Sequence, residues 1–122
     1  MSRQRAEIIE SADCGNSPKN AFVQTIAIAL ETGEADPESF APTVTRDTSA
    51  TDRIEGRTAL IEALEARAMP TKVVIEHAIS HGRVGTATGE TIMANGHRRR
   101  FSHVLTFTNN KATTVATLKS FS

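Results

Sequence analysis

The sequence predicts an α+β domain in which helices pack on the concave face of a curved antiparallel sheet. Helical patterns come first, within residues 6–68, and most strand patterns follow, within residues 72–121. The longest alternating segment, 84–107, has Asn95-Gly96 near its middle, the dipeptide most typical of a tight hairpin turn. Strands of this length twist and curl strongly, so helices lying across them leave a conical cavity at the wide end.

Capping residues place the first two helices. A short helix is predicted over 6–12, because Gly15 follows it as a stop signal. Ser17 can cap the next helix, Pro18 suits its first position, and Gly33 ends it. Every fourth residue along one side of this second helix is apolar, which predicts a buried stripe of Phe22, Ile26 and Leu30.

One turn, a third helix and the strands complete the chain. Asp36-Pro37 repeats the cap-and-proline signal for about one turn. The third helix is predicted over 57–68, with an apolar stripe of Leu60, Ile61 and Leu64. Strands are predicted over 43–48 as a short edge strand, over 72–80, within the hairpin 84–107, and over 112–121.

Composition limits the class of protein. The 122 residues suit a single domain, 1–122, with one core. Lys and Arg number 14 and so do Asp and Glu, whereas proteins that bind nucleic acid or membrane surfaces are normally basic. The lone Cys14 cannot form an intrachain disulfide, and neither a membrane span nor a signal peptide is visible. We therefore expect a cytoplasmic protein with no cofactor and no nucleic-acid or membrane partner.

The hairpin indicates where a cavity lies. With Asn95 and Gly96 as the two turn residues, Ala94 pairs with His97, and the faces follow by counting outward. One face is apolar at one end yet carries polar residues near its middle, and it includes Thr88, Glu90, Phe101, His103 and Leu105. Buried polar groups need partners, so this mixture is typical of a cavity wall.

The opposite face of the hairpin is predicted to be an interface. It collects small and apolar side chains with few charges, namely Ala87, Thr91, Met93, Ser102, Val104 and Thr106. Such a surface suits close packing of two sheets. We therefore expect a homodimer that forms through the outer sheet face.

His77 and His81 are four residues apart, which on a helix would suggest a metal pair. The neighbouring residues 73–75 favour a strand, where the two rings lie ~13 Å apart, too far to share one ion. No metal site is therefore predicted, and His77 is assigned to the cavity wall instead.

Four short motifs carry a resemblance to a known superfamily. They are Cys14-Gly15-Asn16-Ser17-Pro18-Lys19-Asn20, Ile54-Glu55-Gly56-Arg57, Ser80-His81-Gly82 and Phe101-Ser102-His103-Val104 with Phe107. With the order of elements, they resemble the nuclear-transport-factor-2-like superfamily, which includes SnoaL-type cyclases and ketosteroid isomerases. The first motif is similar to a bacterial branch without assigned activity. The resemblance spans nearly the whole chain and implies a cone-shaped, cystatin-like fold, a scaffold that hosts enzymes, binding proteins and transport factors alike.

The resemblance also implies positions for functional residues. The general-base Asp of ketosteroid isomerases lies nine residues before the Gly that opens the third helix, as Asp47 lies before Gly56. His103 stands where their Asp-Val-x-x-Phe pattern has the oxyanion-side Asp, and Ile26 stands where they have a Tyr donor. Two of the three positions differ, which argues against steroid isomerisation.

Each catalytic candidate also has a purely structural interpretation. His103 could act as acid, base or donor near neutral pH, or it could be a core histidine bonded to Thr88 or water. Asp47 could be a base whose pKa is raised by apolar neighbours, or a solvated carboxylate paired with Arg46 or Arg53.

Three functions follow from these alternatives. The leading prediction is a homodimer that binds an apolar or amphipathic small molecule against Ile26, His77, Thr88, Glu90, Phe101 and Leu105. The alternative is a proton-transfer enzyme of the isomerase, cyclase or hydratase kind, with Asp47 as base and His103 as acid or electrophile. The third is a protein-interaction module, which needs no cavity.

Overall fold

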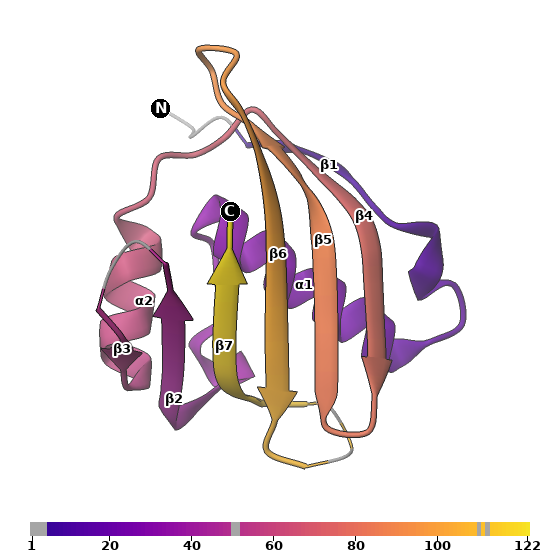
Figure 1. Cartoon of the computed structure of the whole chain (residues 1–122), viewed down its shortest axis with the longest axis vertical. Coiled ribbons are helices and arrows are strands. Elements are labelled where there is room, and N and C mark those ends of the chain that lie inside the picture. Colours follow the sequence, from indigo (N-terminus) through magenta and orange to yellow (C-terminus); the bar gives the residue numbers. More distant parts are fainter. Residues whose placement is uncertain (1–4, 50–51, 110, 112) are drawn as a thin grey trace.

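The computed structural model describes residues 5–49, 52–109, 111 and 113–122. Two helices lie across one face of a curved sheet whose seven strands run in the order β1-β4-β5-β6-β7-β2-β3 (Figure 1). The strands are β1 (Glu7–Ile9), β2 (Phe40–Thr48), β3 (Ile54–Glu55), β4 (Lys72–His81), β5 (Val84–Ile92), β6 (Arg98–Phe107) and β7 (Val115–Phe121). The helices are α1 (Pro18–Thr32) and α2 (Arg57–Glu65), with 3-10 turns at Ala12–Cys14 and Pro37–Ser39. This arrangement confirms the predicted α+β class.

The sheet is mixed rather than purely antiparallel. Strands β4 to β7 form the predicted antiparallel core, but β1 pairs in parallel with β4, and β2 pairs in parallel with β7. The predicted helix over 6–12 is wrong, because Glu7–Ile9 pairs along the edge of β4 and this pairing outweighs local helix propensity. The predicted strand over 43–48 exists but is not an edge, since β3 pairs with it on the side away from β7. Residues 50–51, between the predicted strand 43–48 and the third helix, and Ala112, in the predicted last strand, lie outside the described residues.

Helix α1 begins and ends where its sequence predicts. The Ser17 hydroxyl accepts a hydrogen bond from the Asn20 N–H at 3.2 Å, and Pro18 occupies the first turn. Gly33 ends the helix in the left-handed conformation, at φ 82°, and its N–H donates to Ala29 O at 2.8 Å. A Cβ at this position would lie 2.3 Å from Leu64 O, so glycine also permits α1 and α2 to approach.

Helix α2 is shorter than predicted, because it ends at Glu65 rather than near Ala68. Ala66 is its C-cap, and the Arg67 N–H donates to Leu64 O at 3.1 Å in a tighter final turn. Arg67 therefore lies just beyond the helix.

The β5–β6 hairpin has a three-residue loop rather than the predicted two-residue turn. The Met93 N–H donates to His97 O and the Gly96 N–H donates to Met93 O, each at 2.9 Å, with Gly96 left-handed at φ 86°. Ile92 consequently pairs with Arg98, one residue away from the predicted register. A slip of one residue moves every β5 side chain to the other face of the sheet.

The observed register is the one that packing allows. Residues on the inner face of β6 are large, and those opposite them on β5 are small: Gly89 faces Phe101, Ala87 faces His103 and Gly85 faces Leu105. A Cβ on Gly89 would lie 2.7 Å from the Phe101 ring, and a Cβ on Gly85 would lie 2.6 Å from Val23 of α1. Thr88 and Glu90 could not occupy this space, so they lie on the outer face, while Ala87 and Thr91 are buried on the inner one.

One hydrophobic core lies between the helices and the inner face of the sheet. Of the apolar stripes predicted for the two helices, Phe22 and Ile61 are half-buried, and Ile26, Leu30, Leu60 and Leu64 are buried. Leu105 and Phe107 of β6 are buried against them. No helix in the described part of the chain combines the length and the apolar character needed to cross a membrane. The core ends where polar side chains replace apolar ones on the same inner face.

Candidate functional site

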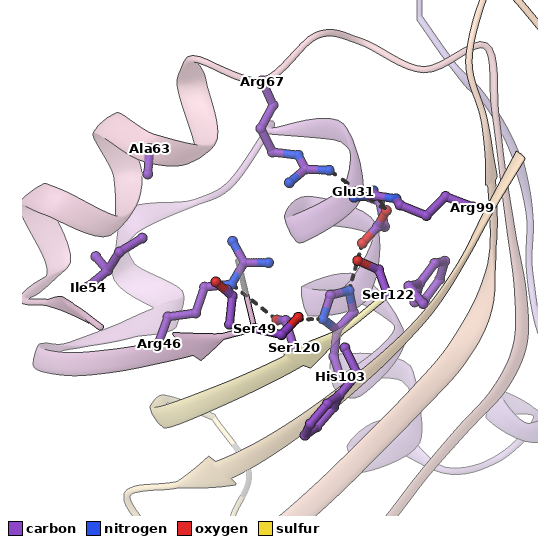
Figure 2. Close-up of a pocket in the computed structure, with 13 residues that line it drawn as sticks. Glu31, Arg46, Ser49, Ile54, Ala63, Arg67, Arg99, His103, Ser120 and Ser122 are labelled. Carbon is purple, nitrogen blue, oxygen red and sulfur yellow. Dashed lines mark hydrogen bonds and ion pairs between the residues drawn. The ribbon is translucent and has the colours of Figure 1, made fainter. Parts of the chain in front are cut away.

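A cavity of ≈ 240 Å³ opens where the ends of α1 and β7 meet α2, β2 and β6 (Figure 2). Its apolar lining comes from several elements and comprises Ile54, Ala63, Phe101 and Phe121. The rest is unusually polar for the inner face of a sheet, with Glu31, Arg46, Arg67, Arg99, His103 and Ser120. Five different elements, or the residues just beyond them, supply these side chains.

Regular periodicity directs each polar group inward. Glu31 continues the buried row of Val23 and Ala27 along α1, because residues four apart share a helix face. His103 and Ser120 are cross-strand partners of β6 and β7, and both side chains face the helices. Arg46 faces the same way from β2, two residues after the buried Val44.

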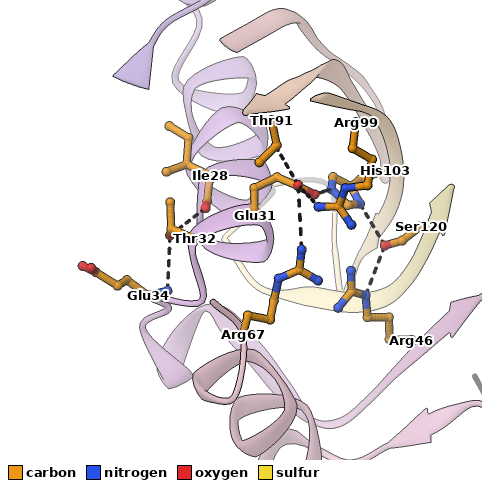
Figure 3. Close-up of polar contacts among 10 residues, drawn as sticks. All are labelled: Ile28, Glu31, Thr32, Glu34, Arg46, Arg67, Thr91, Arg99, His103 and Ser120. Atoms are coloured by element: carbon orange, nitrogen blue, oxygen red, sulfur yellow. Dashed lines mark hydrogen bonds and ion pairs between the residues drawn. The ribbon is translucent and has the colours of Figure 1, made fainter. Parts of the chain in front are cut away.

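A chain of hydrogen bonds connects four of these residues (Figure 3). The Arg46 Nε–H donates to Ser120 Oγ at 3.1 Å, Ser120 Oγ lies 2.8 Å from His103 Nδ1, and His103 Nε2 lies 2.7 Å from Glu31 Oε2. An ionised carboxylate can only accept, so we assign the ring proton to Nε2. Nδ1 then accepts from the Ser120 hydroxyl, and every group in the chain has one consistent role.

Glu31 is an ionised carboxylate although only 2% of its surface is exposed. It accepts hydrogen bonds from Thr91 Oγ1 at 2.8 Å and from Arg99 Nη2, in addition to the bond from His103. Burial alone would raise its pKa, but the hydrogen bond from His103, the charge of Arg99 and the Thr91 bond lower the pKa to about 2.

His103 is the neutral partner in this arrangement. Burial lowers the pKa of its imidazole, and repulsion from Arg46 and Arg67 adds to that effect. The hydrogen bond and charge of Glu31 oppose the decrease without reversing it. At neutral pH the ring is therefore uncharged, with a basic Nδ1 that reaches the cavity through Ser120.

The arginines outnumber the carboxylate that faces them. Burial lowers the pKa of Arg46 to about 10, with repulsion from Arg67 and Arg99 outweighing attraction to Glu31. Burial also lowers the pKa of Arg67, whose Nη2 lies 4.0 Å from Glu31 Oε1. The Arg67 Nε is buried and has no hydrogen-bond partner among the described residues. An arginine side chain keeps its charge in a protein near neutral pH, so the lining side chains carry more positive than negative charge.

The two predicted catalytic residues lie on opposite faces of the sheet. Arg46 faces the cavity, so the next residue on β2, Asp47, faces outward. Asp47 forms a two-point ion pair with Arg53, at 2.8 and 3.1 Å, and this partner lowers its pKa. Strand periodicity therefore separates the residue assigned as base from the residue assigned as acid, and of the two only His103 lines the cavity.

The predicted ligand-binding residues are divided among three regions. Phe101 lines the cavity and stacks on His103, with ring centroids 5.1 Å apart. Ile26 and Leu105 are fully buried in the hydrophobic core. The others lie on the outer face, because β5 has the shifted register and because a bulge between Ile75 and His77 interrupts the alternation of side chains along β4. They are His77, bonded to Asp13 at 3.0 Å, Thr88, and Glu90, paired with Arg98.

Sequence reasoning missed Glu31, Arg46, Arg67 and Ser120 as members of the site. A signal existed for Glu31, which follows Val23 and Ala27 at helical spacing and places a charge on a buried row. The alternation of β2 and β7 likewise indicated Arg46 and Ser120. Arg67 had no such signal, because its position depends on where α2 ends.

Comparison with known proteins identifies the fold. No family model matches the chain, and no curated protein matches its sequence. Several solved structures share its architecture. A candidate ketosteroid isomerase from Kribbella flavida DSM 17836 superposes with TM-score 0.70 and 13% identity, covering 84% of this chain and 76% of that one.

Two further structures cover more of their own length. A protein of unknown function from Mesorhizobium loti, described as NTF2-like, gives TM-score 0.67 and 17% identity over 93% of this chain and 98% of that one. A candidate isomerase of the SnoaL-like family from Agrobacterium tumefaciens gives 0.64 and 15%, over 84% and 96%. Identities this low establish a shared architecture rather than a shared activity. The chain therefore has the nuclear-transport-factor-2-like (NTF2-like) fold that its motifs and order of elements predict.

Proposed function

We propose that this protein binds a small amphipathic molecule in the cavity beside His103. The supporting observation is the cavity itself, which joins a polar wall with ordered hydrogen bonds to an apolar lining that includes Ile54, Ala63 and Phe101. Small-molecule sites typically combine apolar surface with a few well-placed polar groups. A protein-interaction module would have no need for charged groups buried inside the sheet.

A filled cavity gives the sharpest test of this proposal. Ala63→Phe places a ring in the cavity, whereas Ala59→Phe adds the same ring one turn earlier on an exposed part of α2. Native mass spectrometry of gently purified protein should show a bound small molecule in wild type and in Ala59→Phe. We expect the Ala63→Phe variant to lose it. Retention of the molecule by Ala63→Phe, or a wild-type protein without any bound molecule, would contradict the proposal.

Proton transfer is the second candidate function, and the Ser120–His103–Glu31 chain favours it. A neutral imidazole held between a hydroxyl and a carboxylate is the arrangement used to move protons at neutral pH. A ligand would exchange its proton with the Ser120 hydroxyl, whose own proton passes to His103 Nδ1. Glu31, rather than Asp47, would orient and stabilise the imidazole. Isomerases, cyclases and hydratases use this kind of step.

We further propose that the protein is a cytoplasmic homodimer that pairs through the outer face of the sheet. Small and apolar side chains support this assignment: Thr86, Thr88 and Val104 lie beside Ile79 and Val84, which are 50% and 47% exposed. Val104→Asp should give a monomer in light scattering at tens of micromolar, by placing a charge in the interface. Wild-type protein that is already monomeric there would contradict the dimer.

A further inference from the structure

We propose that the cavity is an anion site that binds a small organic carboxylate, with the carboxylate group held between Arg46 and Arg67. The inference rests on the proposed binding function and specifies the polar end of the ligand. Among the described residues that line the cavity, the charged side chains are three arginines and one glutamate. With His103 neutral, Glu31 is the one charged side chain among these that offsets the three arginines.

Glu31 directs its hydrogen bonds to groups other than Arg46 and Arg67. Its Oε1 accepts from Thr91 and Arg99, and its Oε2 accepts from His103. Arg67 approaches no closer than 4.0 Å, which is beyond hydrogen-bond distance. The carboxylate thus bonds Arg99, Thr91 and His103, while its contact with Arg67 is a long ion pair without a hydrogen bond.

Arg46 and Arg67 are the cations of the cavity whose charge or donors are least compensated within the described residues. Arg46 is 7% exposed, and its Nε donates to a neutral hydroxyl rather than to a carboxylate. The Arg67 Nε is buried without a hydrogen-bond partner among the described residues. Burying a charge without a counter-ion is costly, and so is leaving a buried donor unbonded. An anion between the two guanidinium groups would relieve both costs.

The geometry suits a carboxylate on a short apolar body. Arg46 and Arg67 point toward the same space from opposite sides, from β2 and from the end of α2 (Figure 2). A guanidinium matches the planar oxygens of a carboxylate with two parallel donors. The apolar lining, which includes Ile54, Ala63 and Phe101, would contact the remainder of the ligand. A cavity of ≈ 240 Å³ is below the usual range for drug-sized ligands, so the acid must be small.

Paired probes test the charge of the ligand directly. trans-Cinnamate and its neutral isostere cinnamamide have nearly the same shape, so calorimetric titration of wild-type protein with both isolates the carboxylate. Arg67→Gln removes one guanidinium from the cavity. Arg83→Gln removes one from the exposed turn between β4 and β5 and controls for net charge. Inorganic phosphate serves as a second anion.

The proposal expects cinnamate to bind wild type and Arg83→Gln at least tenfold more tightly than cinnamamide, and Arg67→Gln to lose about tenfold or more. Cinnamate should also shift the Arg67 Nε–Hε resonance in NMR spectra. Equal binding of acid and amide would overturn the anion site and leave the proposed binding function standing. Two other results would also overturn the anion site without contradicting the binding function. One is binding of phosphate but not of cinnamate, and the other is no binding of any probe while native mass spectra show a neutral ligand. If no probe binds and no molecule copurifies, both ideas fail.

Discussion

The two faces of the sheet differ in how their arginines are paired with carboxylates. On the outer face, three exposed ion pairs give each arginine its own carboxylate: Asp47–Arg53, Glu76–Arg100 and Glu90–Arg98. On the inner face, Glu31 alone faces Arg46, Arg67 and Arg99 in the described part of the chain. Exposed pairs contribute little to stability and are screened by salt, whereas buried charges are costly unless compensated. The inner face, where arginines outnumber carboxylates, is therefore the one that an anionic ligand can stabilise.

The largest expected difference between the faces comes from removing one carboxylate from each. Glu31→Gln leaves three arginines without a counter-ion and should lower the free energy of unfolding by about 3–5 kcal/mol. Glu90→Gln breaks an exposed pair and should change it by less than about 1 kcal/mol. Urea denaturation of both variants at pH 7 measures the contrast. If the two variants lose similar amounts of unfolding free energy, the Glu31 network contributes no more to stability than an exposed ion pair does.

Acid stability should depend on the inner face in particular. The pKa values of Glu31 and His103 are lower in the folded chain than in the unfolded chain, so the unfolded chain binds more protons. The folded state therefore loses stability as the pH is lowered. For His103 the loss begins below its usual 6.5, and for Glu31 it runs from 4.5 down to about 2. The Glu31 contribution is of the order of 3 kcal/mol.

Thermal unfolding from pH 2 to 8 checks this dependence. The loss between pH 4.5 and 2 should be much smaller in Glu31→Gln than in wild type. Asp47→Asn should retain most of the loss, because Asp47 is an exposed group on the outer face. An unchanged acid transition in Glu31→Gln would refute the assignment of an ionised Glu31.

Two histidines provide a smaller but cleaner contrast. His103→Phe keeps an aromatic ring in the core but deprives Glu31 and Ser120 of a partner, so it should cost about 2–3 kcal/mol. His77→Phe breaks one exposed contact with Asp13 and should cost less than about 1 kcal/mol. Binding of the copurified ligand should weaken only in His103→Phe. If His103→Phe destabilises the protein without affecting the ligand, His103 is simply a bonded core histidine.

The smallest expected effect concerns the residue that the motif resemblance implied as a base. Asp47→Asn should leave ligand affinity and any turnover within about twofold of wild type, because its side chain faces Arg53 and not the cavity. Its effect on stability should also stay below about 1 kcal/mol. A loss of tenfold or more in binding or turnover would restore Asp47 to the site and require the loop after β2 to move.

Much of the fold follows from local sequence. Ser17-Pro18 and Gly33 predict both ends of α1, and alternation predicts β4 and the two hairpin strands, because caps and periodicity depend on neighbouring residues. The candidate site was harder to predict from local sequence. His103 and Phe101 were found, since an inward histidine is unusual on a buried strand, but their partner Glu31 lies 72 residues before His103. No local pattern links residues that distant.

The sequence by itself determined the α+β class, the limits of α1 and the existence of the hairpin, because hydrophobic spacing and backbone preferences act over a few residues. Only the tertiary structure decided the register of that hairpin. Asn95-Gly96 is compatible with a two-residue or a three-residue loop, and the choice depends on Phe101 needing the space above Gly89. That choice moved Thr88 and Glu90 to the outer face. The charge of the cavity was decided in the same way, since burial and long-range contacts, rather than residue type, set how Glu31, Arg46 and Arg67 are balanced.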